Sequence, residues 1–285
     1  MKNVKHIVSS VSLILIISML FTGYVHADFK IAIMQDKKGA AAKFRPLLNY
    51  LNQNGIKVSF AAAKNYQHAA KLFSNGEADA MFSGSGIAGC FIIKGLADPV
   101  VRPVSKDGWS TYWAVVLAPE NTGRFTQNAE YFNDKRVIFC SLASSGEFFY
   151  RSVKGESNID SVILKAASHG SAIDALSRSS ADIAIVKNRV WDNVKEKYNN
   201  IVRVGEDPGE NPNGTLIVSK KTDPQIVELV ASLLLGLEND ISSEAKSVKE
   251  KLKITGYIGT SLQDFKCTIA LLKKAGVDKF FNFSF

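Results

Sequence analysis

Alternation of strand patterns with helical patterns is the feature that most limits the folds open to this chain of 285 residues. Residues 29–34 have strand composition, residues 40–52 have helical spacing, and residues 57–61 form a second strand candidate. A helix over 67–73 and a strand over 78–82 follow. Strands and helices that alternate at this spacing build mostly parallel sheets through right-handed crossovers. The chain is therefore expected to be an α/β protein.

One sequence phrase occurs twice, with its aspartates 103 positions apart at Asp79 and Asp182. Residues 73–82 and 176–185 each contain a helix end, a polar turn, an Ala-Asp pair and an apolar strand. Because the helix and the strand repeat together with the dipeptide, the pattern predicts two lobes built on one plan.

The chain is expected to cross between these lobes twice. An apolar stretch over 111–118 indicates the first crossing, and the turn at 209–214 indicates the return. The predicted organisation is a first lobe from 28–117 and 214–285 and a second lobe from 118–213. Two crossings make a hinge, so a ligand is expected between the lobes, outside the carboxyl ends of the strands.

The N-terminus has the pattern of a secretory signal peptide over residues 1–27. Lys2 and Lys5 precede an apolar run, and Val25-His26-Ala27 ends in small residues suited to cleavage. We expect a soluble protein exported to the periplasm.

Charge and cysteine content narrow the function classes. The formal charge of +8 falls to +6 when the two lysines of the signal peptide are removed, which suits a small anionic ligand. Basic residues are scattered, so nucleic-acid binding is not expected. Cys90, Cys140 and Cys267 are too far apart for metal-ligand spacing, so no metal and no cofactor is expected, and all three are predicted to be small buried residues.

A hydroxyl-rich turn in the second lobe is the leading candidate for the binding site. An apolar strand over 137–140 leads into Ser144, Ser145 and Gly146 at the start of a predicted helix. Unpaired amides at a helix start, beside serine hydroxyls and the positive end of the helix dipole, can bind a phosphate-like anion. The alternative is an ordinary N-cap, because serine is a common capping residue.

Further polar residues are predicted to meet this turn in the cleft. They are Tyr66 before a helix, Ser83 and Ser85 after a strand, Tyr112 on the crossing strand, and His169 at the start of another helix. Each keeps a structural alternative: packing for the tyrosines, a tight connection for the serines, and a helix cap for the histidine.

With these residues in place, the chain resembles the periplasmic substrate-binding proteins of phosphate, phosphite and phosphonate ABC transporters. The resemblance covers residues 29 to about 257. It rests on Asn65-Tyr66, Asn75-Gly-Glu-Ala-Asp-Ala80, Tyr112-Trp113, the Ser-Ser-Gly turn, and Ser168-His169 followed by Ala181-Asp182.

The resemblance implies an α/β fold of the two-lobed periplasmic-binding-protein type 2, with each lobe a mostly parallel sheet flanked by helices and a two-strand hinge between them. It further implies that Ser144, Ser145 and the Gly146 amide hold the phosphoryl oxygens. Tyr66, Tyr112 and His169 would donate hydrogen bonds from other directions.

Departures from the family pattern bear on ligand choice. Relatives that take aminoalkylphosphonates resemble one another in having acidic residues at two places, where this chain has Val186-Lys-Asn-Arg189 and Pro212-Asn-Gly-Thr215. A protonated amine would meet Lys187 or Arg189, unless those side chains are solvated. The predicted ligand is therefore an oxyanion without an amino group. Trp109 either leaves room for an apolar or flat substituent or lines the core.

The predicted function is capture of such an oxyanion and its delivery to an ABC permease by a monomeric binding protein. A periplasmic sensor that signals to a membrane kinase or cyclase is the alternative. An enzyme is less favoured, because the sequence has no Ser-His-Asp spacing with a nucleophile elbow and no paired-carboxylate site.

Overall fold

The computed structural model describes residues 28–34, 40–64, 66–140 and 144–282. The predicted signal peptide, residues 1–27, lies outside this part of the chain. Within the described ranges, no helix has both the length and the apolar character needed to span a bilayer.

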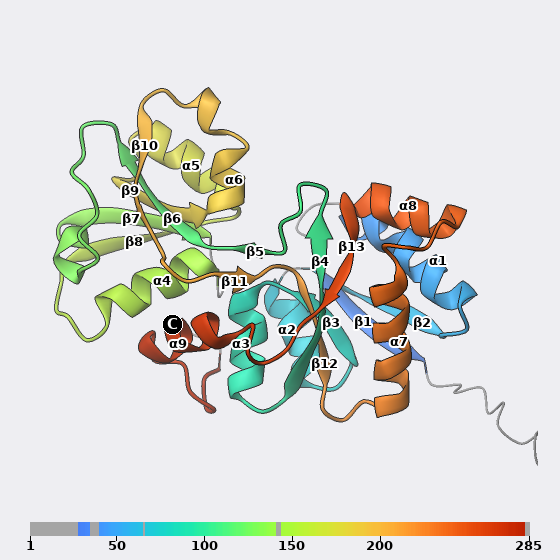
Figure 1. The fold of residues 1–285 in the computed structure, drawn as a ribbon. Coiled ribbons are helices and arrows are strands. Elements are labelled where there is room, and N and C mark those ends of the chain that lie inside the picture. Colours follow the sequence, from blue (N-terminus) through green and yellow to red (C-terminus); the bar gives the residue numbers. More distant parts are fainter. Residues whose placement is uncertain (1–27, 35–39, 65, 141–143, 283–285) are drawn as a thin grey trace, which may run out of the picture.

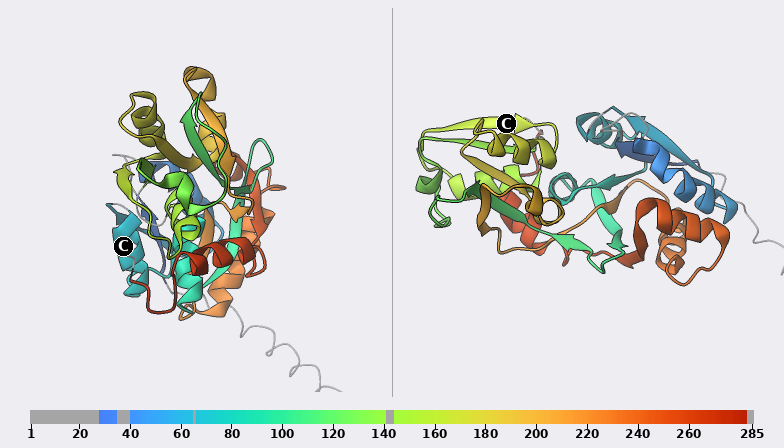
Figure 2. Two further views of the ribbon diagram at one scale, coloured as in Figure 1. Left: turned by 90° about the vertical axis from the view of Figure 1, so that its left-hand side faces the viewer. Right: turned by 90° about the horizontal axis from the view of Figure 1, so that it is seen from above.

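Two separate sheets form the centres of two lobes that lie side by side (Figures 1 and 2). The first sheet contains β1 (Phe29–Met34), β2 (Val58–Ala63), β3 (Ala80–Ser83), β4 (Ala97–Ser105), β12 (Thr215–Ser219) and β13 (Ile254–Gly259). The second contains β6 (Ala114–Pro119), β7 (Lys135–Cys140), β8 (Ser161–Ala166), β9 (Ile183–Lys187) and β10 (Ile201–Glu206). A two-stranded ribbon of β5 (Thr111–Tyr112) and β11 (Asn211–Pro212) links them.

The two sheets share one topology. In the first, β2, β1 and β3 are parallel neighbours, and the returning strand β12 lies antiparallel between β3 and β4. In the second, β8, β7 and β9 are parallel neighbours, and the incoming strand β6 lies antiparallel between β9 and β10. The predicted α/β architecture of two lobes is confirmed, and in each sheet the strand that follows the hinge lies antiparallel to a strand of the parallel group.

The repeated Ala-Asp pair has the same role in both sheets. The Asp79 carboxylate accepts a hydrogen bond of 2.8 Å from the Lys30 amide of β1, and the Asp79 amide donates to the Lys30 carbonyl. Asp182 makes the same two contacts with Arg136 of β7. Each aspartate thus pairs the backbone at the point where a central strand begins, which explains why the phrase recurs.

Helices flank both sheets (Figure 1). Those of the first lobe are α1 (Arg45–Gln53), α2 (Tyr66–Ser74), α3 (Ser85–Ile93), α7 (Pro224–Gly236) and α8 (Ser243–Leu252). Those of the second are α4 (Ser145–Lys154), α5 (His169–Ser177) and α6 (Asn188–Asp192). Short 3-10 turns are η2 (Ala40–Phe44), η3 (Ala129–Phe132) and η4 (Lys195–Lys197).

The last helix, α9 (Lys266–Lys274), contacts both lobes. It packs against α3 of the first lobe and α4 of the second. Phe148 of α4 lies in one apolar cluster with Phe91 of α3 and Leu272 of α9. The Thr268 hydroxyl also donates a hydrogen bond of 2.7 Å to the Asn211 side chain on β11. The C-terminal helices were expected on the first lobe; α7 and α8 lie there, whereas α9 bridges the junction.

The crossing points follow from strand pairing. Residues 114–117 belong to β6 and pair within the second sheet, although the expected boundary placed them in the first lobe. Sheet membership changes at Trp113, which separates β5 from β6. On the return, it changes between β11 and β12, near the expected boundary at 213.

Candidate functional site

A cavity of about 320 Å³ lies where the two lobes and the hinge meet. Its lining comes from all three parts of the molecule. The first lobe contributes Lys43, Phe44, Phe82, Ser83, Gly84, Ile87, Pro103, Leu252, Ile254 and Tyr257; the hinge contributes Tyr112, Asn213 and Gly214; the second lobe contributes Cys140, Ser144, Ser145, His169 and Lys187.

The start of α4 supplies one wall of this cavity. Ser144 is the N-cap, and its Oγ accepts a hydrogen bond of 3.1 Å from the Glu147 amide. The neighbouring Ser145 Oγ is buried and makes no direct hydrogen bond. The two serines therefore differ: Ser144 caps the helix and also lines the cavity, whereas the buried Ser145 hydroxyl makes no hydrogen bond of regular geometry but lies near enough to the Tyr112 hydroxyl to lower the pKa of that tyrosine.

Close packing at the same helix start requires glycine at position 146. A Cβ at this position would lie 2.3 Å from the Ile185 carbonyl oxygen of β9. Only glycine lets α4 approach the strand this closely, and this approach fixes where the first amides of the helix lie. Residues 141–143 of the same turn lie outside the described residues.

His169 is the first residue of α5, with Ser168 as its N-cap. Its ring lines the cavity, and the buried Nδ1 has no hydrogen-bond partner. Burial lowers the pKa of the imidazole to about 4, and the nearby Lys187 charge contributes to this shift. A neutral histidine can donate one hydrogen bond to an anion without adding charge.

Lys187, the last residue of β9, supplies the cationic group. Its Nζ donates a hydrogen bond of 2.5 Å to the Asn213 Oδ1 and lies 4.1 Å from the centroid of the Tyr112 ring. Burial lowers the pKa of Lys187 to about 7, with a contribution from the Arg189 charge. An anion in the cavity would favour the charged form of this lysine.

Tyr112 on the hinge, Ser83 at the end of β3 and Ser85 at the start of α3 form a further polar group at the site. The Tyr112 hydroxyl and the Ser85 Oγ form a hydrogen bond of 2.5 Å, and both residues are buried. Burial raises the pKa of Tyr112, and the hydroxyls of Ser85 and Ser145 partly oppose this effect. Ser83 lines the cavity and donates to the Gly84 carbonyl. Ser85 lies behind Tyr112 instead of on the cavity wall.

Ser85 also begins a helix, which the sequence pattern did not indicate. Its residues 85–91 are buried without interruption, so α3 has no polar face and no helical period to detect.

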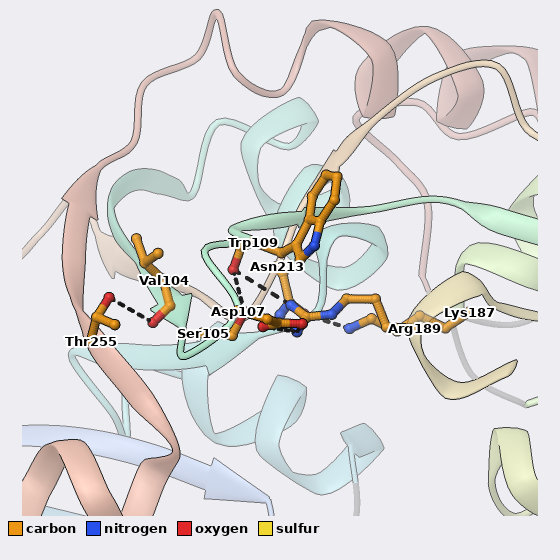
Figure 3. A network of polar contacts seen from close by, with 8 residues as sticks. All are labelled: Val104, Ser105, Asp107, Trp109, Lys187, Arg189, Asn213 and Thr255. Carbon is orange, nitrogen blue, oxygen red and sulfur yellow. Dashed lines mark hydrogen bonds and ion pairs between the residues drawn. The ribbon is translucent and has the colours of Figure 1, made fainter. Parts of the chain in front are cut away.

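Two of the residues considered for specificity lie outside the cavity. Arg189 of α6 donates to the Asp107 carboxylate at 2.9 Å and to the Ser105 hydroxyl at 2.9 Å, both on the first lobe (Figure 3). Trp109 belongs to the same loop and is 49% exposed. Its ring packs edge-on against Trp113. Arg189 therefore connects the lobes, and Trp109 does not contact the cavity.

Tyr66 begins α2, but its side chain lies outside what the structure describes. The sequence prediction did not include Phe44, Phe82, Tyr257 or Asn213 among the lining residues. Asn213 lies in the return crossing, where its position next to Gly214 was a usable signal. The three aromatic residues carried no motif.

The cysteines differ in burial. Cys90 is buried, and burial raises the pKa of its thiol to about 12. Cys140 lines the cavity, and Cys267 on α9 is exposed. The prediction that all three are buried is therefore wrong for Cys267, which lies on the outward side of an amphipathic helix.

The chemistry of the cavity is that of a donor-rich anion site. The described lining residues include one lysine from each lobe, Lys43 and Lys187, and no aspartate or glutamate. Across the described part of the chain, no group of histidine, cysteine and acidic residues is arranged to hold a metal ion.

Comparison with known proteins agrees with this geometry. Residues 29–265 match the family described as ABC transporter, phosphonate, periplasmic substrate-binding protein. No curated protein matches the sequence. Several solved structures share the fold at low sequence identity.

XAC2383 from Xanthomonas citri, bound to chloride, has a TM-score of 0.73 and 12% identity, covering 87% of this chain and 97% of that one. PhnD1 from Prochlorococcus marinus, in complex with methylphosphonate, has a TM-score of 0.69 and 14% identity, covering 87% and 98%. A binding protein component of an ABC phosphonate transporter from Pseudomonas aeruginosa has a TM-score of 0.65 and 15% identity, covering 86% of each chain.

Proposed function

The chain belongs to the phosphonate-binding family of periplasmic ABC-transporter substrate-binding proteins, and we propose that it captures a tetrahedral oxyanion without an amino group and delivers it to an ABC permease. Residues 1–27 act as the export signal in this proposal. Members of this family bind solutes for transport and are not enzymes.

One observation carries the proposal. Two buried polar atoms, Ser145 Oγ and His169 Nδ1, have no hydrogen-bond partner, and both belong to residues that line one cavity with Lys187. Buried polar groups are otherwise almost always paired, so unpaired atoms at a cavity point to a missing partner. The first amides of α4 add donors and a positive dipole end at the same wall. An oxyanion supplies the acceptors that such donors need.

The charge of the site supports a ligand without an amine. Lys187 is partly buried, and the described lining residues include no carboxylate that would pair with an ammonium group. A protonated amine would therefore lose its hydration and meet a like charge. The PhnD1 structure from Prochlorococcus marinus was solved with methylphosphonate, a ligand of the expected kind.

Ligand capture would be coupled to the hinge. An oxyanion that contacts Ser145 and His169 on the second lobe and Tyr112 at the hinge would stabilise the closed arrangement by its higher affinity for that arrangement. The closed form would then dock on the permease.

Isothermal titration of the exported protein tests the proposal. We expect methylphosphonate to bind and 2-aminoethylphosphonate to bind at least tenfold more weakly. Lys187→Met should weaken methylphosphonate binding, whereas Lys195→Met removes the same charge from an exposed position in the same lobe and should leave binding unchanged. Tighter binding of 2-aminoethylphosphonate, or no binding of phosphate, phosphite or any phosphonate, would refute the proposal.

A further inference from the structure

We propose that the oxyanion carries an aromatic or similarly bulky apolar substituent, which lies against aromatic side chains of the first lobe. This inference rests on the proposed function, because it assigns the second half of the same cavity. The two walls of that cavity differ in chemistry, and this difference supports the assignment.

The first-lobe wall of the cavity is aromatic. Phe44 and Phe82 stack with ring centroids 5.6 Å apart and an interplanar angle of 23°. Tyr257 continues the row, with its ring centroid 6.2 Å from that of Phe82. These three residues, which we call the ring wall, come from η2, β3 and β13 and line one cavity.

The rest of the first-lobe lining is also largely apolar. Ile87, Leu252 and Ile254 contribute aliphatic side chains. Of the described polar residues on this side, Lys43 is exposed, with its Nζ 5.1 Å from the Phe44 ring centroid, and the Ser83 hydroxyl donates to the Gly84 carbonyl. Neither Lys43 nor Ser83 therefore offers the ligand a buried, unpaired hydrogen-bond donor.

The second-lobe wall is polar by contrast. Ser145 and His169 hold their unused polar atoms there, and Lys187 lies beside them. The Tyr112 ring and Asn213 stand at the hinge between the two walls and are already bonded to Ser85 and Lys187 respectively. The cavity therefore has an oxyanion end and an apolar end.

The cavity has room for more than a bare oxyanion. At about 30 Å³ for each water-sized group, a volume near 320 Å³ accommodates roughly ten non-hydrogen atoms, about twice the content of a phosphate ion. Filling the remainder with water would place that water against aromatic rings, which offer it few hydrogen bonds. An apolar substituent covers this surface favourably.

The alternative is that the ring wall belongs only to the core. Phe44 and Phe82 do pack against the first-lobe core, but both are only partly buried there. Their remaining surface contributes to the cavity lining. Core packing therefore accounts for only part of the surface of these two rings.

The test compares phosphonates that share a head group. Titration calorimetry with methylphosphonate, phenylphosphonate and 3-phosphonopropionate varies only the substituent, which is small, aromatic, or extended and polar. We expect phenylphosphonate to bind at least tenfold more tightly than either of the others. Equal or tighter binding of methylphosphonate would overturn the inference while leaving the proposed function standing. Failure of every phosphonate to bind would overturn the inference, and failure of phosphate and phosphite as well would also remove the proposed function.

Variants separate the two ends of the cavity. Phe44→Ala should reduce the preference for phenylphosphonate over methylphosphonate to less than threefold, with methylphosphonate affinity changed by less than twofold. Phe82→Leu, which keeps an apolar side chain at a strand position, should reduce the preference in the same direction. Lys187→Met should weaken both ligands by the same factor and so preserve the preference. Phe280→Ala, at a position 76% exposed, is the matched control and should leave the preference for phenylphosphonate unchanged. If Phe44→Ala and Phe82→Leu fold and also leave this preference unchanged, the assignment is refuted.

Discussion

The Lys187 ammonium group lies over the face of the Tyr112 ring, 4.1 Å from its centroid. This pairing holds a partly buried cation beside the cavity, and no carboxylate among the described residues pairs with it. The ring face and the Asn213 oxygen stabilise the charge only in part, which is why burial still lowers the pKa of Lys187 to about 7. The site is thus one negative charge short of a balanced arrangement, and the proposed ligand supplies it.

Replacing Lys187 should weaken ligand binding without destabilising the folded protein. Lys187→Met removes the cation, and we expect phosphonate affinity to fall about 10- to 100-fold, since charge-assisted contacts are worth about 1.5 to 3 kcal/mol. The free energy of unfolding of the ligand-free protein should stay the same or rise, because a poorly compensated buried charge is lost. Calorimetric titration and urea unfolding measure the two quantities, and loss of stability without loss of affinity would contradict the assigned role.

The pH dependence should run in opposite directions for stability and for binding. The folded pKa of Lys187, about 7, lies below its ordinary value of 10.5. Between these pH values the unfolded chain binds more protons, so this group makes the ligand-free protein more stable as pH rises.

An anionic ligand binds best when Lys187 is charged, so affinity should fall above pH 7 by up to about tenfold per pH unit. Lys187→Arg keeps its charge at every accessible pH. The ratio of the wild-type to the variant dissociation constant, measured with one ligand from pH 6 to pH 9, isolates this lysine. A constant ratio would contradict the prediction.

The two serines of the α4 turn should respond differently to loss of the hydroxyl. Ser144→Ala removes the N-cap bond to the Glu147 amide and should lower the free energy of unfolding by about 1 kcal/mol. Ser145→Ala removes a buried hydroxyl without a partner, so stability should be unchanged or slightly higher.

The order of the two variants should be reversed for ligand affinity: Ser145→Ala should cause the larger loss, about tenfold. Both variants are compared by thermal unfolding without ligand and by titration with methylphosphonate. If Ser145→Ala destabilises the ligand-free protein as much as Ser144→Ala does, then the Ser145 hydroxyl has a structural partner and is not reserved for a ligand.

Regular periodicity made most of the fold predictable from the sequence. The repeated phrase around Asp79 and Asp182 indicated two lobes, because a side chain that must pair with the first strand requires the same local sequence each time. The helix start at Ser145 was predictable from its serines and the strand before it. α3 was not, because a helix buried on every side has no amphipathic pattern.

The candidate site, too, could be predicted from the sequence only in part. Lys187 and Arg189 were both named because the region lacks the acid of the family pattern, but only Lys187 lines the cavity. Lys187 ends β9, whereas Arg189 lies in the first turn of α6, so one lines the cavity and the other contacts Asp107. The ring wall could not be predicted, because Phe44, Phe82 and Tyr257 are distant in sequence and meet only through sheet order.

Glycine at the α4 start can be tested against its counterpart in α5. Gly146 and Gly170 are each the second residue of their helix. A Cβ at Gly146 would lie 2.3 Å from the Ile185 carbonyl oxygen, whereas at Gly170 the nearest atom would be the Ser168 Oγ at 3.8 Å.

Gly146→Ala should therefore destabilise the protein by about 2 to 3 kcal/mol. Gly170→Ala should leave stability unchanged or raise it by up to about 1 kcal/mol, since alanine favours the helix. Chemical denaturation of both variants measures the difference. Equal effects would show that α4 does not require this close approach to β9.

Arg189 should influence ligand affinity through the position of the lobes. Its guanidinium contacts Asp107 and Ser105 on a loop of the first lobe (Figure 3). The Lys106 amide of this loop donates a hydrogen bond to the Lys253 carbonyl. The Asp107 side chain is 62% exposed, so the pair is worth about 0.2 to 1 kcal/mol. Arg189→Ala should then shift the ligand-free protein toward more open forms and weaken phosphonate binding about two- to fivefold. Small-angle scattering should show a larger radius of gyration for the free variant and the wild-type value once ligand is saturating. Arg203→Ala removes a comparable ion pair with Glu206 that lies wholly within the second lobe. This control should change neither the radius of gyration nor phosphonate affinity. An equal effect from both variants would show that the contact with Asp107 does not hold the lobes together.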